Sequence, residues 1–237
     1  MKEKQIQHER SFGSKVARLL SRLIIYGFLL SVFYILFCKW INPPITITQI
    51  VSLVRGDGLK RDYVDIEEMS ENIKLAVLAG EDQLFPDHNG FDFKSIQKAM
   101  KHNQRNKSLR GASTISQQVA KNVFLWQHGG YLRKGLEVYF TFMIENLWSK
   151  KRILEMYLNV AETGVGIFGV EAAAKYYFHK SAKNLSAKES ALIASCLPNP
   201  AVYTIRPLSN RVSYRYPWIM RQMNGLRSDP DIRGLLK

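Results

Sequence analysis

Residues that build disulfide or metal-held frameworks are scarce in this sequence of 237 residues. The two cysteines, Cys38 and Cys196, lie far apart in or beside apolar runs, so they form no disulfide framework and no metal-binding pattern. We interpret both as packing residues. The five histidines have neither an HExxH motif nor a paired spacing typical of a metal site, and no repeat or low-complexity stretch is present. A disulfide scaffold and a histidine-based metal centre are therefore excluded.

Acidic residues are also few, since 20 Asp and Glu stand against 34 Lys and Arg, which gives a net charge of +14. Such a surface favours a polyanionic partner: nucleic acid, acidic lipid headgroups or a phosphorylated substrate. Charge alone does not choose among them. The length allows one membrane anchor and one domain of about 150–200 residues, so a second catalytic domain would not fit.

Long apolar runs are absent except for one near the N-terminus, LIIYGFLLSVFYILFC, from Leu23 to Cys38. Its 16 uncharged residues are slightly fewer than the about 20 that usually span a bilayer. Arg22 and Lys39 can extend their charged ends to the headgroups, however, and Trp40 suits the membrane interface. The pattern therefore predicts a single transmembrane helix over residues 23–41.

A cleaved signal peptide is the alternative, because its apolar core runs about 7–15 residues, but no small-x-small cleavage site follows Phe37. Basic residues are concentrated before the apolar run, and only Lys39 follows it closely. Those before it are Lys2, Lys4, Arg10, Lys15, Arg18 and Arg22. The positive-inside bias predicts that residues 1–22 form a cytoplasmic basic tail and that the main domain lies outside the cytoplasm.

Asn42-Pro43-Pro44 should break any helix that leaves the membrane, and the β-branched stretch 45–54 predicts an extended linker or a short hairpin. We assign residues 42–63 to a linker or membrane-proximal arm. Residues 64–237 should form a mainly α domain, since apolar residues recur there at three-to-four spacing. The predicted helices are 72–84, 93–101, 114–126, 133–147, 151–160, 170–178 and 187–197, with a proline-rich loop before a last helix near 218–226.

The first stretch that suggests chemistry runs from Gly80 to Asp92. Two adjacent acids, Glu81 and Asp82, end an apolar helix. Burial there would raise the pKa of Glu81 and let it act as a general base. On spacing alone, a hydrated acid at a helix end is the commoner outcome.

The second stretch runs from Arg110 to Asn122. Thr114 with Gln117 matches a capping box, so a helix should begin here. Its polar face would carry Thr114, Gln118, Lys121 and Asn122. Such a face at the positive end of a helix suits phosphate or pyrophosphate, although an ordinary solvated face is compatible with it. The low charge of this face favours ligand binding.

The third stretch is Arg133 to Glu137, followed by seven uncharged, largely bulky residues, 138–144. These residues surround a helix on every side, so the helix is buried or touches lipid, with Glu137 at its edge. One interpretation pairs Glu137 with Arg133 one turn earlier, worth about 0.2–0.5 kcal/mol if exposed. The other makes Glu137 the second acid of a carboxylate pair.

Two short motif matches are interpreted as chance. Residues 164–169 spell GxGxxG, but the segment before them is helical in pattern, so a turn between two packed helices explains the glycines better than a dinucleotide site. Ser95 to Lys98 match the SxxK of penicillin-binding transpeptidases, but the KTG motif is absent.

Taken in order, these stretches resemble glycosyltransferase family 51, and within it the monofunctional biosynthetic peptidoglycan transglycosylases of Gram-negative bacteria. The resemblance covers about Val64 to Leu226. Its motifs are EDxxFxxHxGFD (81–92), GxSTIxQQxxKN (111–122), RKxxE (133–137), SKxxILExYLN (149–159), GxGxxGVxxAAxxYF (164–178) and LPNP (197–200). The anchor, the outward domain and the lack of a transpeptidase domain agree with the monofunctional branch.

The resemblance implies a lysozyme-like domain with a small membrane-proximal lobe, in the bacterial inner membrane, with the catalytic domain in the periplasm. The implied reaction polymerises lipid II into β-1,4-linked glycan strands and releases polyprenyl diphosphate. Glu81 would be the base that deprotonates the acceptor 4-hydroxyl. Glu137 would assist the departing pyrophosphate, directly or through a divalent cation such as Mg or Mn, while Lys121 neutralises its charge.

By the same resemblance, further residues would bind substrate or shape the site. These are Asp82, Phe85, His88, Ser113, Thr114, Gln118, Asn122 and Arg133. One position departs from the family pattern: many relatives carry an arginine four residues before the RK pair, where this chain has Gly129. Either another cation substitutes, with His128 as a neighbouring candidate, or donor binding is weaker.

Two other functions remain as alternatives. A lysozyme-like glycan-cleaving enzyme would use the same kind of cleft but would shorten glycan, and a non-catalytic scaffold of a wall-synthesis complex would tolerate replacement of Glu81. The expected partners are lipid II, the growing glycan strand and membrane lipid, together with other cell-wall synthesis and division proteins. A nucleic-acid partner would fit the charge, but the predicted topology keeps the domain out of the cytoplasm.

Overall fold

The computed structural model describes residues 2–105, 111–127 and 129–236. They fall into two units, residues 1–41 and residues 42–237, which are considered separately. The first unit consists of one helix, α1 (Lys2–Trp40). Its segment 15–40 contains an 18-residue window with a mean hydropathy of 2.1 and is long and apolar enough to cross a membrane. At 1.5 Å per residue this segment reaches about 39 Å, more than the about 30 Å of a hydrocarbon core.

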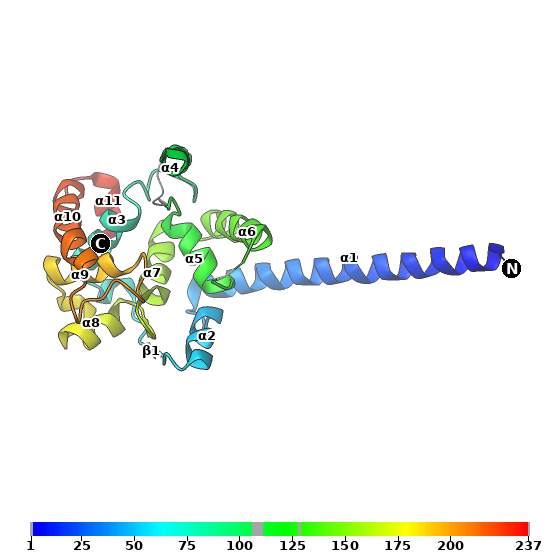
Figure 1. Ribbon diagram of the computed structural model, residues 1–237, viewed down its shortest axis with the longest axis horizontal. Coiled ribbons are helices and arrows are strands. Elements are labelled where there is room, and N and C mark those ends of the chain that lie inside the picture. The colour runs from blue at the N-terminus through cyan, green and yellow to red at the C-terminus, as the bar shows by residue number, and fades with distance from the viewer. Residues whose placement is uncertain (1, 106–110, 128, 237) are drawn as a thin grey trace. The chain divides into compact units, whose positions relative to one another are not determined.

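The second unit, here called the domain, is mainly helical, as predicted (Figure 1). Its helices are α2 (Ile47–Arg55), α3 (Glu71–Glu81), α4 (Phe93–Arg105), α5 (Ile115–Phe124), α6 (Tyr131–Leu147), α7 (Lys150–Val160), α8 (Val170–Phe178), α9 (Ala187–Cys196), α10 (Asn210–Leu226) and α11 (Pro230–Leu236). Two 3-10 turns, η1 (Ile66–Glu68) and η2 (Ala182–Asn184), and the strands β1 (Lys60–Arg61), β2 (Glu162–Gly164) and β3 (Ile167–Phe168) complete the described elements.

The core of the domain is built around α3, whose residues 73–79 are all buried. Helices α9 and α10 pack against α3 and against each other, whereas α5 packs against α6, α7 and α2. Cys196 is buried at the end of α9, in agreement with its interpretation as a packing residue. The C-terminal end of α3 contacts both α5 and α10.

The prediction of an extended arm at residues 45–54 was wrong, because this segment forms α2. Thr46 and Gln49 form a capping box, in which the Thr46 hydroxyl accepts from the Gln49 N–H at 3.3 Å. Gly56 ends the helix in the left-handed conformation, with a φ of +81°. The apolar residues of α2 also recur at helical spacing, and these cues together outweigh the preference of β-branched residues for strands.

The last predicted helix was placed too late. The proline-rich loop was expected to end at Pro217, but α10 begins at Asn210 and contains Pro217 in its interior. Pro217 lacks the N–H that would bond to the carbonyl four residues earlier, which is a cost to the helix. Packing of α10 against α3 and α9 offsets that cost.

The GxGxxG segment connects α7 to α8, but it forms the hairpin of β2 and β3 rather than a plain turn. Strand β3 also pairs in parallel with β1, so β1, β3 and β2 form one small sheet among the described residues. Gly166 has a φ of +69°, and a Cβ atom there would lie 2.2 Å from the Asp57 carbonyl oxygen. This glycine therefore permits close approach of the 57–58 backbone, which supports the rejection of a dinucleotide site.

Candidate active site

Glu81 is the last residue of α3, and its side chain is largely buried, with 10 % exposed. Its two carboxylate oxygens have different partners: Arg215 Nη2 donates to Oε1 at 3.0 Å, and Gln118 Nε2 donates to Oε2 at 3.0 Å. Burial raises the pKa of Glu81 by more than the contacts with Gln118 and Arg215 lower it. A buried carboxylate with a raised pKa, held by two directed contacts, is suited to general-base chemistry.

Arg215 was not identified from the sequence. It lies on α10, 134 residues from Glu81, and its Nη2 also donates to the Gly80 carbonyl at 2.8 Å. Tyr157 was also missed as a site residue, although the motif SKxxILExYLN includes it. Its buried hydroxyl donates to Gln118 Oε1 at 3.1 Å, which orients the Gln118 amide so that its nitrogen faces Glu81.

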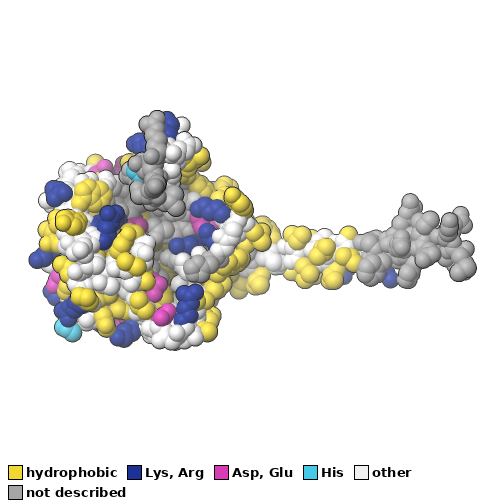
Figure 2. Space-filling view, in the orientation of Figure 1, with side chains coloured by type: hydrophobic (Ala, Val, Ile, Leu, Met, Phe, Trp, Pro, Cys, Tyr) yellow, Lys and Arg dark blue, Asp and Glu magenta, His cyan; other side chains and the backbone are white. Residues whose placement is uncertain are grey.

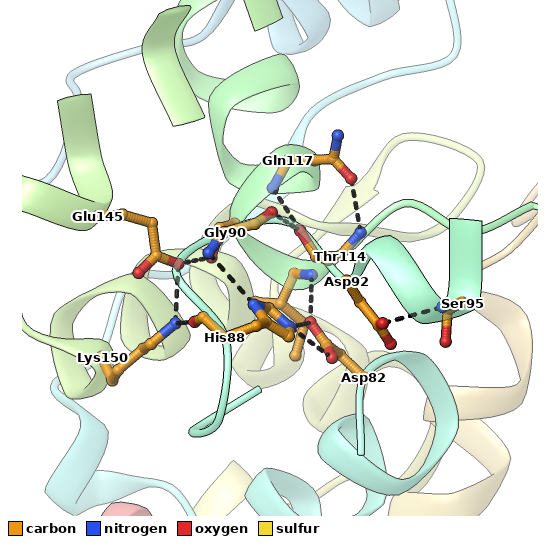
Figure 3. Close-up of polar contacts among 11 residues, drawn as sticks. Asp82, His88, Gly90, Asp92, Ser95, Thr114, Gln117, Glu145 and Lys150 are labelled. Carbon is orange, nitrogen blue, oxygen red and sulfur yellow. Dashed lines mark hydrogen bonds and ion pairs between the residues drawn. The ribbon is translucent and has the colours of Figure 1, made fainter. Parts of the chain in front are cut away.

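Asp82 and His88 connect the loop after α3 to the start of α5 (Figure 3). The His88 Nε2 lies 3.0 Å from Asp82 Oδ1, and the Ile115 N–H donates to Asp82 Oδ2 at 3.0 Å. The Gly90 N–H donates to His88 Nδ1 at 3.2 Å, so this hydrogen-bond pattern places the proton of a neutral His88 ring on Nε2. Phe85, in the same loop, is fully buried and packs edge-on against His88, so it stabilises the conformation of the loop.

The second motif begins α5 as predicted. Thr114 is the N-cap, and the capping box with Gln117 is confirmed: the Gln117 N–H donates to the Thr114 hydroxyl at 3.2 Å. The Thr114 hydroxyl donates to the Gly90 carbonyl at 2.7 Å, and Asn122 accepts from Gln127 at 2.9 Å. Both side chains are thus buried in protein contacts.

Of the other predicted residues of this motif, Ser113 is exposed, and Gln118 and Lys121 are partly exposed. The polar face therefore exists, but only Gln118 and Lys121 of its four members have appreciable exposure. They lie one turn apart on the side of α5 that carries the contact with Glu81.

Glu137 is buried in α6 and is paired with two cations. Arg133 Nη1 donates to one oxygen at 2.7 Å, and Lys134 donates to the other oxygen. The pairing of Glu137 with Arg133 considered from the sequence is therefore present, and Lys134 adds a cation that was not singled out. Figure 2 shows basic and acidic side chains next to each other over the region of α5 and α6.

Lys121 links the two glutamates electrostatically. Burial lowers the pKa of its ammonium group, Glu137 and Glu81 raise it, and Arg133 and Lys134 lower it. Lys121 therefore interacts electrostatically with both carboxylates, and two further cations, Arg133 and Lys134, bond directly to Glu137. The local excess of positive charge suits a diphosphate.

The described residues form no site that holds a divalent cation with protein ligands alone. Among the described residues, no group of three or more His, Cys, Asp or Glu side chains could hold a metal ion. Both oxygens of Glu137 already bond to cationic side chains. A metal ion bound to Glu137 would have to displace one of them.

Gly129 occupies the position at which an arginine was expected from the family pattern. A Cβ atom there would lie 2.9 Å from Arg133 Cβ and 2.9 Å from Trp126 Nε1. An arginine at this position would therefore require Arg133 or Trp126 to move. The other candidate, His128, lies outside the described residues.

The chain is similar to known proteins over most of its length. The family described as Transglycosylase matches residues 47–224 of this chain. A biosynthetic peptidoglycan transglycosylase of Haemophilus influenzae is 54 % identical over 185 residues, which cover 76 % of this chain and 75 % of that protein. A protein of the same name from Mannheimia succiniciproducens is 46 % identical over 227 residues, covering 93 % and 91 %, and one from Pseudomonas syringae is 47 % identical over 211 residues, covering 86 % and 89 %.

Proposed function

The chain belongs to the transglycosylase family, with a lysozyme-like helical domain and the activity of a peptidoglycan glycosyltransferase in cell-wall synthesis, and from this premise we propose that it polymerises lipid II. The products are β-1,4-linked glycan strands and polyprenyl diphosphate. The observation that carries the proposal is the buried Glu81, placed between Gln118 and Arg215 and within the electrostatic reach of Lys121.

The proposed reaction begins with ionised Glu81. It takes the proton from the 4-hydroxyl of the acceptor sugar, and the hydroxyl oxygen forms a bond to the anomeric carbon of the donor strand. The bond between that carbon and the diphosphate oxygen breaks, so the α-linked donor becomes a β-linked product. The proton stays on Glu81 until Glu81 is deprotonated again for the next transfer.

The departing diphosphate gains negative charge, and cations already held in place stabilise it without reorganisation. Lys121, Arg133 and Lys134 have this role in the proposal. Glu137 is itself an anion, so it cannot stabilise the diphosphate directly. It acts by holding Arg133 and Lys134, whose contacts with its two oxygens support this assignment.

The divalent cation implied by the family resemblance stays a prediction. Both oxygens of Glu137 bond to Arg133 and Lys134, and the proposed reaction has no step that requires a metal. Titration of Mg or Mn into EDTA-treated enzyme, with the rate of lipid II polymerisation as the readout, measures the contribution of the cation.

The direct test is polymerisation of purified lipid II by the detergent-solubilised protein, with the products sized on a gel. Wild type should form glycan ladders that a muramidase digests, and Glu81→Gln should form none, because glutamine cannot accept the proton. Glu155→Gln is the matched control, since burial also raises the pKa of Glu155 and Arg152 also pairs with it. That control should keep the activity.

The alternative functions make different predictions in the same assay. A glycan-cleaving enzyme would shorten finished glycan and leave lipid II unpolymerised. A non-catalytic scaffold would show no difference between wild type and Glu81→Gln. Polymer formation by Glu81→Gln at the wild-type rate would remove Glu81 as the base.

A further inference from the structure

Helices α6 and α7 both contact the loop after α3. Glu145 of α6 and Lys150 of α7 form an ion pair, with Lys150 Nζ donating to Glu145 Oε1 at 2.9 Å. Lys150 Nζ also donates to the His88 backbone carbonyl (Figure 3). The Ser116 hydroxyl of α5 donates to Glu145. The pair therefore joins the loop to the first turn of α5.

These contacts close a ring of hydrogen bonds. On one side of the ring, Asp82 links the His88 side chain to the Ile115 N–H of α5. On the other side, Glu145 and Lys150 link the His88 carbonyl to Ser116, the residue after Ile115. These two sets of atoms thus join the loop to the start of α5, in addition to the bond from the Thr114 hydroxyl to the Gly90 carbonyl.

Both members of the pair are shielded from water and are in contact with the loop. The side chains of Glu145 and Lys150 are 5 % and 22 % exposed. The Lys150 ammonium lies 4.6 Å from the centre of the buried Phe85 ring. Gly90 has a φ of +84°, and a Cβ atom there would lie 2.9 Å from Glu145 Cγ. The loop therefore rests directly on this ion pair.

The consequence for the reaction follows from what the ring connects. Asp82 directly follows Glu81 in the chain, and α5 carries Gln118, which bonds to Glu81, and Lys121. The ring therefore sets the position of the candidate base relative to the cation that receives the diphosphate. A displacement of about 1 Å between reacting groups can lower a rate by about a hundredfold.

We propose that Glu145 and Lys150 are positioning residues for glycosyl transfer, which hold Glu81 in register with Gln118 and Lys121 without touching substrate. The inference rests on the proposed function. A positioning role differs from an ordinary structural role. An ion pair that only stabilises the fold would change the melting temperature and leave the chemical step of the folded enzyme unchanged.

The test measures kcat and KM for lipid II with Lys150→Met, Glu145→Gln and the double variant. For each single variant, kcat should fall at least about tenfold because the reacting groups lose register. KM should stay within about twofold, since the cations that bind the diphosphate remain. The double variant should lose no more than the worse single variant, as expected of two residues that act as one unit.

Lys180→Met is the matched control, because Lys180 pairs with Glu189 at 3.0 Å. Among the described residues this pair has no hydrogen bond or ion pair to the loop or to α5. It should leave kcat unchanged. Should Lys150→Met fail to fold, Ser116→Ala opens the ring without removing a charge, and the same fall in kcat is expected.

The proposal is overturned if folded Lys150→Met keeps the wild-type kcat, or if its loss appears in KM alone. It is overturned equally if the two single losses multiply in the double variant. Wild type and Glu81→Gln are measured beside these variants, so the proposed function can stand when the positioning proposal fails.

Discussion

The ionisation state of a single carboxyl group, that of Glu81, determines the pH range in which the proposed reaction can run. As a base it must be ionised, so activity should fall as pH decreases through its pKa. Burial raises that pKa, whereas the Arg215 charge and hydrogen bond lower it. The arginine therefore extends activity to lower pH than burial alone would allow.

Replacing Arg215 should shift the acidic limb of the pH profile. Arg215→Met removes the charge and the hydrogen bond that lower the pKa of Glu81, so the pKa rises and the limb moves to higher pH. Activity lost at neutral pH should be partly recovered in alkaline buffer. The measurement is kcat/KM for lipid II against pH, with Arg215→Lys as a variant that keeps the charge and should shift the limb less.

A uniform loss at every pH would contradict this role for Arg215 and would point to a steric effect instead. The comparison is informative because Arg215 donates to both Gly80 and Glu81, so Arg215→Met also removes a backbone contact.

The residues of this site differ in how far the sequence could predict them. Thr114 with Gln117 spells a capping box, so a local pattern predicted the helix start. For Glu81 the apolar helix before it allowed burial, but spacing alone favoured a hydrated acid, and only the family resemblance predicted a base. Arg215 has no such pattern, because its function depends on α10 packing beside α3. Contacts between residues far apart in the sequence leave no local signature.

At the level of the element, α2 shows how local cues compete. Thr46 and Gln49 satisfy each other's backbone groups at the N-terminus, and Gly56 ends the helix. The sequence contains these cues, and in α2 they outweigh the β-branched composition of 45–54. Gln127 also donates to Thr48 at 2.8 Å and to Asn122, which ties α2 to α5.

Removing the α2 cap should destabilise the fold and spare the chemistry. Thr46→Ala leaves the Gln49 N–H without its side-chain acceptor, which should lower the free energy of unfolding by about 1 kcal/mol. Denaturant unfolding of the detergent-solubilised protein measures the change, and lipid II polymerisation of the folded variant should stay near wild type. Thr46→Ser keeps the hydroxyl and should unfold like wild type, so an equal loss in both variants would exclude the cap as the cause.

At the scale of the whole molecule, the proposed reaction requires the domain to lie on the wall side of the membrane. Helix α1 contains one segment able to cross a bilayer, and its composition does not state a direction. The direction is predicted from charge: basic residues precede the uncharged apolar run 23–38, and the positive-inside rule counts those within about 15–20 residues of its ends. The N-terminus is therefore expected in the cytoplasm and the domain outside it.

Reporter fusions at the C-terminus test this orientation. An alkaline phosphatase fusion, active only outside the cytoplasm, should be active, and a cytoplasmic reporter fusion should be silent. Changing Lys15, Arg18 and Arg22 to Gln should lower the phosphatase signal per molecule, because these charges hold the N-terminus inside. Changing Lys98 and Lys101 of α4 to Gln removes charge from the domain and should leave the signal unchanged. A phosphatase-silent wild-type fusion would put Glu81 on the wrong side of the membrane for wall synthesis and would make a nucleic-acid partner the better explanation of the +14 charge.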